Sequence, residues 1–205
     1  EQARKCKQAY FATQSFVDAQ VGRLLDALEE NGILEKTIIV FWSDHGYFLG
    51  EKGLWYKRKA FERSVRVPLI ISVPGMGAGE RFKQPVELLD LYPTLMDLCE
   101  LPMTDQLQGK SLRAVLTDPV ANSLDKPAVT LVWYGRESWG YTLRNDRYRY
   151  MEWMEGRAGR ELYDHAEDPD EITNLVDDPK YTELIASLSL QLKTYVPGAP
   201  HARNP

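Results

Sequence analysis

The sequence has few cysteines. Cys6 and Cys99 lie far apart and match no metal-binding or redox spacing, which excludes a site built from paired cysteines. We expect each to be a buried free thiol, because free cysteine behaves as a small apolar residue. A bond between the two, or from either to another segment, remains an alternative.

The chain also lacks a long apolar run and an excess of positive charge. No stretch reaches the roughly 20 apolar residues that span a bilayer, and residues 1–5 do not lead into the apolar region of a signal peptide. The formal net charge of −5 argues against a general nucleic-acid coat. We therefore expect neither membrane insertion nor nucleic-acid binding. Since the first residue is not methionine, we expect a processed or truncated piece, for which secretion remains open.

The first part of the chain has the pattern of an α/β domain. Apolar residues at helical spacing predict a helix over residues 17–28, which Asn31-Gly32 would end. The β-branched and aromatic run over residues 37–42 predicts a strand buried on both faces, and residues 67–73 predict another. A helix broken or started by Pro93 is expected over residues 88–98. We assign residues 1–126 to this α/β part.

The composition of the sequence changes at about residue 127. Aromatic-rich segments over residues 128–133, 141–153 and 161–164 predict antiparallel strands, with a turn at Asn145-Asp146. An amphipathic helix begins at Asp178-Pro179, where aspartate caps the helix and proline occupies its first position. Residues 127–205 are therefore expected to form a smaller α+β subdomain of antiparallel strands and a helix. His165, in an acidic turn of this part, is expected to be structural or at the surface.

Candidate chemistry follows the first predicted strand. Asp44 and His45 come at its carboxyl end, where open α/β sheets bind ligands. A carboxylate and an imidazole can supply part of a metal shell for Ca²⁺, Mg²⁺ or a Zn²⁺-type ion. Lys57 would then place a compact positive charge on an anionic oxygen shared with the metal. The alternative is that Asp-His-Gly forms only a turn, with Asp44 capping local N–H groups.

A basic segment follows these residues. Its positive charge would favour an anionic substrate. For any single residue of the segment, the alternative is a place in a solvated loop, where the residue pairs with an acid elsewhere in the chain. Its members between residues 52 and 66 are Lys52, Lys57, Arg58, Lys59, Arg63 and Arg66.

Six segments, in order along nearly the whole chain, carry a family resemblance. They are "SFVDAQVGRLLDALEENGILEKTIIVFWSDHG", "LGEKGLWYK", "RVPLIISVPG", "LLDLYPTLMDLCEL", "YTLRNDRYRYMEW" and "ELYDHAEDPDEITNL". Together they resemble the C-terminal portion of type I sulfatases of the alkaline-phosphatase-like superfamily, most closely the iduronate-2-sulfatase and choline-sulfatase-like members. The resemblance implies part of an alkaline-phosphatase-like sandwich with a smaller C-terminal α+β subdomain.

The resemblance also implies roles for individual residues. Asp44 and His45 would be ligands of Ca²⁺, with Mg²⁺, Zn²⁺ or Mn²⁺ as alternatives. Lys57 would contact the sulfate, and Tyr47 would face the substrate, although a plain packing role suits Tyr47 equally. The substrate would be a sulfated sugar such as iduronate 2-sulfate in glycosaminoglycans. The enzyme would be bacterial periplasmic or secreted, or lysosomal if eukaryotic.

One family feature is missing from this sequence. The family's nucleophile is a formylglycine made within a Cys/Ser-x-Pro-x-Arg motif, and neither cysteine begins such a motif here. We therefore expect the nucleophile, and the aspartate pair that completes the metal site, on the N-terminal part of the same enzyme, in the same chain or in a processed partner chain. The 205-residue chain alone should be inactive.

Two other functions remain open. One is a phosphonate or phosphate-diester hydrolase of the same superfamily, whose members also place Asp-His at this strand end. The other is a non-catalytic module that binds anionic glycans through the basic segment, without dependence on a metal.

Overall fold

The computed structural model describes residues 1–77, 79–120, 122–135 and 138–196. The chain divides into two compact units, Glu1–Lys57 with Arg66–Ala78, and Arg58–Val65 with Gly79–Pro205. These units do not follow the expected boundary after residue 126, and that boundary remains a prediction about the domains of the family. The last residues of the predicted subdomain, 197–205, lie outside the described residues.

The first unit begins with a long helix, α1 (Gln2–Glu30), which includes the predicted helical segment and ends at Asn31 as expected. Gly32 follows with a left-handed backbone, φ +65°. The helix has no buried residue, so Cys6 is exposed rather than buried as predicted. Its apolar side chains, including Phe16 and Leu24, are about two-thirds exposed.

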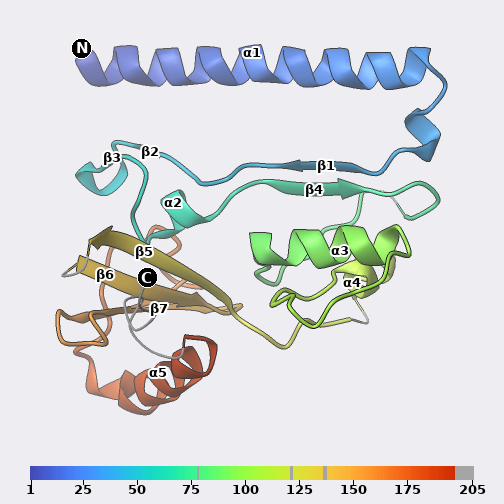
Figure 1. Ribbon diagram of the computed structural model, residues 1–205. Coiled ribbons are helices and arrows are strands. Elements are labelled where there is room, and N and C mark those ends of the chain that lie inside the picture. The colour runs from blue at the N-terminus through green and yellow to red at the C-terminus, as the bar shows by residue number, and fades with distance from the viewer. Residues whose placement is uncertain (78, 121, 136–137, 197–205) are drawn as a thin grey trace. The chain divides into compact units, whose positions relative to one another are not determined.

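Two short strands form the extended part of this unit (Figure 1). After the 3-10 helix η1 (Leu34–Lys36), β1 (Ile39–Trp42) pairs antiparallel with β4 (Leu69–Ser72). The prediction that the first strand is buried on both faces is wrong for this chain, because no third strand among the described residues joins the pair and Trp42 is 47% exposed. The apolar run predicted the strand correctly, but not what covers it.

A small hairpin follows β1 in the first unit. β2 (Phe48–Leu49) pairs with β3 (Trp55–Tyr56) across the 3-10 turn η2 (Glu51–Gly53). Phe48 is fully buried and anchors the hairpin. Gly50 adopts φ +110°, and a Cβ there would lie 3.3 Å from the Trp55 ring. Glycine at this position therefore permits the tight return of the chain.

The second unit is built on an antiparallel sheet in the order β5-β6-β7-β8. The strands pair antiparallel, as predicted, with a turn between β6 and β7 at Asn145. The strands are β5 (Ala128–Gly135), β6 (Ser138–Arg144), β7 (Tyr148–Trp153) and β8 (Arg160–Asp164).

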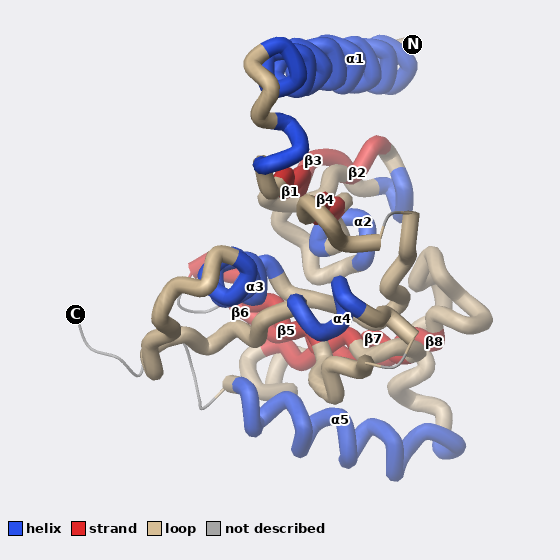
Figure 2. The backbone as a smooth tube through the Cα atoms, turned by 90° about the vertical axis from the view of Figure 1, so that its right-hand side faces the viewer, coloured by secondary structure: helices blue, strands red, loops and turns tan. Residues whose placement is uncertain are grey.

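Helix α5 (Thr182–Tyr195) covers one face of this sheet (Figure 2). It follows the 3-10 turn η4 (Pro179–Tyr181), whose cap Asp178 accepts a hydrogen bond from the Lys180 N–H. Leu188 and Leu192 pack on Leu143, Tyr150 and Leu162. A smaller apolar cluster lies on the opposite face, where Ala60 precedes α2 (Glu62–Val65); it also contains Val132, Met151 and Tyr163. This arrangement confirms the α+β subdomain of antiparallel strands and one helix.

The remaining helices of the second unit are short. η3 (Leu88–Asp90) leads into α3 (Leu91–Leu98), with Pro93 in the first turn of α3, and α4 (Arg113–Thr117) follows. Cys99 ends α3 and is exposed, which corrects the expectation of a buried thiol there too. None of the described helices has the length and apolar character needed to cross a bilayer.

Candidate active site

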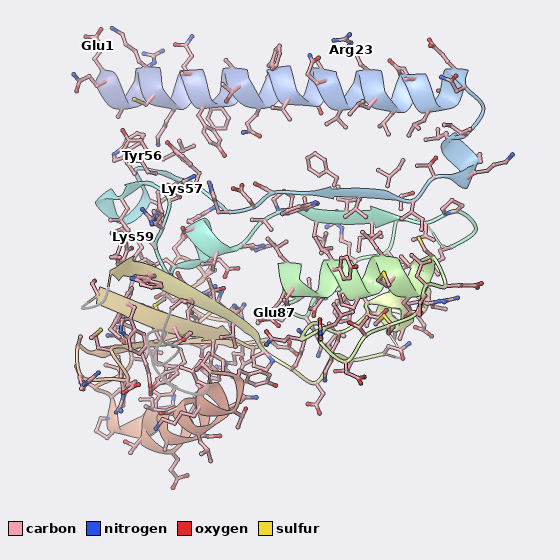
Figure 3. All side chains as sticks on the ribbon, in the orientation of Figure 1. Glu1, Arg23, Tyr56, Lys57, Lys59 and Glu87 are labelled. Atoms are coloured by element: carbon pink, nitrogen blue, oxygen red, sulfur yellow. The ribbon has the colours of Figure 1, made fainter. Side chains whose placement is uncertain are left out.

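The predicted site residues lie in the first unit. Asp44 and His45 follow β1, and the β2–β3 hairpin returns the chain toward them. Lys57, labelled in Figure 3, follows β3 directly. The Lys57 Nζ is 2.7 Å from the Nε2 of His45, although twelve residues separate the two. The hairpin thus brings three of the four predicted site residues together.

A backbone contact determines which nitrogen of His45 is available. The Nδ1 of His45 lies 2.8 Å from the carbonyl oxygen of Gly46. Because a carbonyl can only accept, Nδ1 carries the proton and Nε2 keeps its lone pair. That lone pair accepts from the Lys57 ammonium here, and it is the electron pair that an imidazole offers to a metal ion.

Asp44 supplies the second possible ligand. Its Oδ2 lies 3.3 Å from the Nε2 of His45. Two ligand atoms that share one cation at about 2.0–2.5 Å each are separated by roughly this distance. A carboxylate oxygen and an imidazole nitrogen therefore fit a divalent cation, although two ligands fill only part of its shell.

The turn-only alternative for Asp44 finds little support. Among the described residues, the Asp44 carboxylate accepts no hydrogen bond from a backbone N–H, and its side chain is 74% exposed. In place of Asp44, the Ser43 hydroxyl bridges the turn by donating to the carbonyl oxygen of His45 at 3.0 Å. The carboxylate of Asp44 is thus available for a ligand.

The backbone around Lys57 is strained. Tyr56 and Arg58, on either side of it, adopt φ +68° and +70°, and Lys52 in the preceding turn adopts φ +54°. Such left-handed conformations are uncommon for residues other than glycine and gather at functional sites. These conformations cost free energy, and they flank the residue whose ammonium contacts His45.

Tyr47 lies between two other tyrosine rings. Its ring centroid is 5.1 Å from that of Tyr10 and 6.1 Å from that of Tyr56. These contacts are those of the packing alternative. A role in substrate contact remains a prediction.

The basic segment is only partly free for an anionic ligand. Arg63 donates to the Asp170 carboxylate at 3.1 Å, and the Lys59 ammonium lies 5.3 Å from the ring centroid of Tyr134. Both contacts lie within the second unit. For Arg63 the structure therefore agrees with the alternative of pairing with an acid elsewhere in the chain.

A buried ionic network in the second unit was not anticipated from the sequence. The Arg149 guanidinium, 2% exposed, donates to the carboxylates of Glu62 and Glu171 and to the Thr142 hydroxyl. His165 adds its Nε2 at 2.9 Å from Glu171. The side chain of His165 is 8% exposed, so it is structural and not at the surface. Since 22 and 87 residues separate Arg149 from its two acids, local sequence patterns could not reveal the network.

This network contains donor atoms of a possible metal site, but its chemistry is that of an ion pair. The ligand atoms of Glu62, His165 and Glu171 lie within 4.8 Å of one another. The carboxylates already pair with cations of the chain, since the Arg149 guanidinium contacts both and the Arg144 Nε lies 3.8 Å from Glu62. Burial acts to raise the pKa of Glu171, but the hydrogen bond from His165 and the charge of Arg149 outweigh it and hold that pKa below its usual value.

Comparisons with known proteins find similar sequences and similar structures. The sequence profile described as "N-sulphoglucosamine sulphohydrolase, C-terminal" matches residues 50–196. A protein named sulfatase from Formosa agariphila is 37% identical over 92% of this chain and 36% of its own length. The choline-sulfatase of Rhizobium meliloti is 37% identical over 88% of this chain and 35% of its own length.

Several solved structures have a similar fold over most of this chain. A protein in complex with its substrate D-glucosamine-2-N,6-O-disulfate has a TM-score of 0.82 and 31% identity over 92% of this chain and 40% of its own. A 2-O GAG sulfatase reaches 0.78 at 31% identity, with coverages of 88% and 40%. A phosphonate monoester hydrolase of Agrobacterium radiobacter reaches 0.78 at 28% identity, with coverages of 87% and 38%. The chain therefore spans well under half the length of these proteins.

Proposed function

Because this chain belongs to the sulfatase family of the alkaline-phosphatase-like superfamily and matches its C-terminal part, we propose that it completes the active site of a sulfuric ester hydrolase. The observation that carries the proposal is the contact of Lys57 with His45, which also lies beside Asp44. This arrangement offers two metal ligands that follow β1 and, beside them, one cationic donor that follows β3. A tetrahedral anionic group such as a sulfate ester presents oxygens that suit both.

The residues have distinct tasks in this proposal. Asp44 and the Nε2 of His45 hold a divalent cation, which we propose to be Ca²⁺, with Mg²⁺, Zn²⁺ and Mn²⁺ as alternatives. When bound, the cation polarises the sulfate oxygens as a Lewis acid. The Lys57 ammonium donates to a sulfate oxygen and stabilises the charge that develops there. The hydrogen bond to Gly46 keeps the proton of His45 on Nδ1, so that Nε2 is left to coordinate the cation.

The role of Lys57 is tested by the variant Lys57→Ala in the complete enzyme that carries this chain. Loss of one donor to the transition state lowers kcat by roughly 10²–10³-fold, so hydrolysis of an aryl sulfate should fall by that factor. Lys36→Ala is the matched control, since Lys36 is exposed in η1 and should leave kcat unchanged. An unchanged kcat in Lys57→Ala would remove Lys57 from the site.

The metal proposal has a readout apart from activity. Binding of a cation to the Nε2 of His45 should shift the imidazole NMR resonances of that residue when Ca²⁺ is added to the chelated protein. Asp44→Asn should weaken this binding, because a neutral amide replaces one charged ligand. If the His45 resonances do not respond to any of the four cations, His45 is not a ligand.

We propose that the nucleophile, a formylglycine, lies on the N-terminal part of the same enzyme, either in one longer chain or in a processed partner chain. The exposed apolar residues of α1 and β1 favour a covering partner of this kind. Tandem mass spectrometry of the purified enzyme should find the modified residue outside this chain, and the 205-residue chain alone should not hydrolyse sulfate esters. Turnover by that chain alone would contradict this assignment.

A sulfated sugar is the proposed substrate, with iduronate 2-sulfate in glycosaminoglycans as its specific form and Tyr47 as a possible substrate contact. Support comes from the 2-O GAG sulfatase and from the protein that binds a disulfated glucosamine. A bacterial periplasmic or secreted enzyme, or a lysosomal one in a eukaryote, would meet such substrates. Release of sulfate from 2-sulfated disaccharides, compared with 6-sulfated ones, tests the position.

A second reaction is favoured by one of the structural comparisons. The phosphonate monoester hydrolase has the same fold over 87% of this chain, so hydrolysis of a phosphonate or phosphate diester is the alternative. Relative kcat/KM on an aryl sulfate and an aryl phosphodiester separates the two activities. A non-catalytic module for anionic glycans would bind saccharide equally well after chelation, which a binding measurement with and without chelator decides.

A further inference from the structure

The second unit contains a surface pocket that takes no part in the proposed reaction. Its volume is about 380 Å³. It lies at one end of the sheet, where β6 begins, β7 ends and β8 begins. The lining residues are Ser138, Trp139, Trp153, Met154, Ala158 and Glu161.

The indole ring of Trp153 is held firmly at this pocket. Gly140 is its cross-strand partner, and a Cβ at Gly140 would lie 2.5 Å from the indole Cε3, so the ring lies directly on the backbone of β6. The indole N–H donates to Glu161 Oε1 at 2.9 Å. The Tyr134 ring lies nearly parallel to it, inclined by 19° with centroids 6.5 Å apart. The indole is therefore oriented before any ligand arrives, which lowers the entropic cost of binding.

Glu161 gives the pocket a negative charge that no cation of the described chain neutralises. Its Oε1 accepts from Trp153, and its Oε2 accepts from the Tyr163 hydroxyl at 2.6 Å. Both donors are neutral, and no described lysine, arginine or histidine forms an ion pair with this carboxylate. A carboxylate offers about four acceptor positions, so it retains capacity for further donors.

The backbone on the third side of the pocket is strained. Met154 and Glu155 adopt φ +51° and +59°, and Gly156 continues at φ +83°. Two consecutive left-handed residues other than glycine are costly, and such strain persists where the surrounding structure imposes it. This connection turns sharply out of β7 and places Met154 on the pocket wall.

We propose that this pocket binds an unsulfated sugar ring. An indole packs on the C–H face of a pyranose, and hydroxyl groups of the ring donate to the carboxylate of Glu161. A sulfate group would meet the unneutralised charge of Glu161 and be rejected. The ligand class rests on the proposed function, because a sulfated saccharide has neighbouring rings, some of them unsulfated, that a subsite away from the sulfate can hold.

The test measures sugar binding to the complete protein by saturation-transfer NMR, with N-acetyl-D-glucosamine and its 6-sulfate as probes. The neutral sugar should bind, and Trp153→Phe should weaken it by about tenfold through loss of indole area and of the hydrogen bond to Glu161. Trp42→Phe, the same substitution in β1 of the first unit, should leave the affinity unchanged. Equal affinities for wild type and Trp153→Phe would overturn the proposal.

A second variant tests the charge and separates this pocket from the reaction site. In a Lys57→Ala background, Glu161→Gln should bring the affinity for the 6-sulfate close to that for the neutral sugar, because the amide keeps an acceptor without the charge. If Lys57→Ala alone abolishes binding of the neutral sugar, the sugar occupies the reaction site and the pocket proposal is wrong. If aryl sulfate hydrolysis is absent but binding still depends on Trp153, the proposed function fails and the pocket stands.

Discussion

We expect Arg149 to contribute more to the free energy of unfolding of the second unit than any exposed ion pair does. Replacing it by methionine removes the closest cation of Glu62 and Glu171, and removal of one partner from a buried pair costs about 3–5 kcal/mol. Urea unfolding should show this loss. Arg63→Met is the control, because its pair with Asp170 is more than half exposed on both sides and should cost less than about 1 kcal/mol.

The contributions of charge and of packing to this loss of stability can be measured separately. If the cost comes from uncompensated negative charge, adding Glu62→Gln and Glu171→Gln to Arg149→Met should recover part of the stability. A triple variant as unstable as Arg149→Met would mean that the guanidinium acts mainly by filling space.

The candidate site shows what single residues can reveal from sequence. The position of Asp44 and His45 after a strand was predictable because it is a local feature, and their roles stay predictions. The hairpin that brings the Lys57 Nζ to 2.7 Å from the Nε2 of His45 was not predicted. The tautomer of His45 was not predictable, since it depends on a contact with the Gly46 carbonyl. The burial of His165 was likewise not predictable, because its partner Glu171 is itself held by Arg149, 22 residues away along the chain.

Glycines in two elements should respond in opposite directions to the same substitution. In β6, Gly140→Ala places a Cβ 2.5 Å from the Trp153 ring and 3.0 Å from the carbonyl oxygen of Glu152, so we expect a loss of about 1–3 kcal/mol. In α1, Gly22 has nothing within 4 Å of its Cβ position, and Gly22→Ala should add roughly 0.5–1 kcal/mol to the helix. Thermal unfolding followed by circular dichroism measures both. A destabilised Gly22→Ala would mean that another surface lies close to α1.

At the scale of elements, the longer strands and the last helix were predictable, but β2, β3 and the first half of α1 were not predicted, and neither was the burial of the elements. Alternation around Asn145 predicted β6 and β7, and Asp178-Pro179 predicted the start of the last helical segment. The run over residues 37–42 predicted a strand, yet Phe41 and Trp42 are more than a third exposed. Hydrophobicity reports the environment that a strand is suited to, whereas burial depends on which other segments are present to cover it.

Acid sensitivity is a property of the whole molecule, because carboxylates in several places contribute to it. The hydrogen bond from Arg147 lowers the pKa of Asp164, and the hydrogen bond from Ser111 lowers that of Asp97. Glu171 also has a lowered pKa, as its contacts with His165 and Arg149 outweigh its burial. Each group binds protons more weakly in the folded state than in the unfolded state, so the unfolded state gains protons first as the pH falls.

The lowered pKa values determine how stability changes with pH. The stability from these carboxylates is present above their ordinary pKa values, about 3.8 for aspartate and 4.5 for glutamate, and is lost as the pH falls through the lower folded values. The urea midpoint should therefore be steady between pH 7 and pH 5 and should drop below about pH 4.5. Glu171→Gln should lower the midpoint at pH 7 and flatten its decline in acid, because one titrating group is removed. A midpoint that rises on acidification would show that other groups, with raised pKa values, dominate the balance.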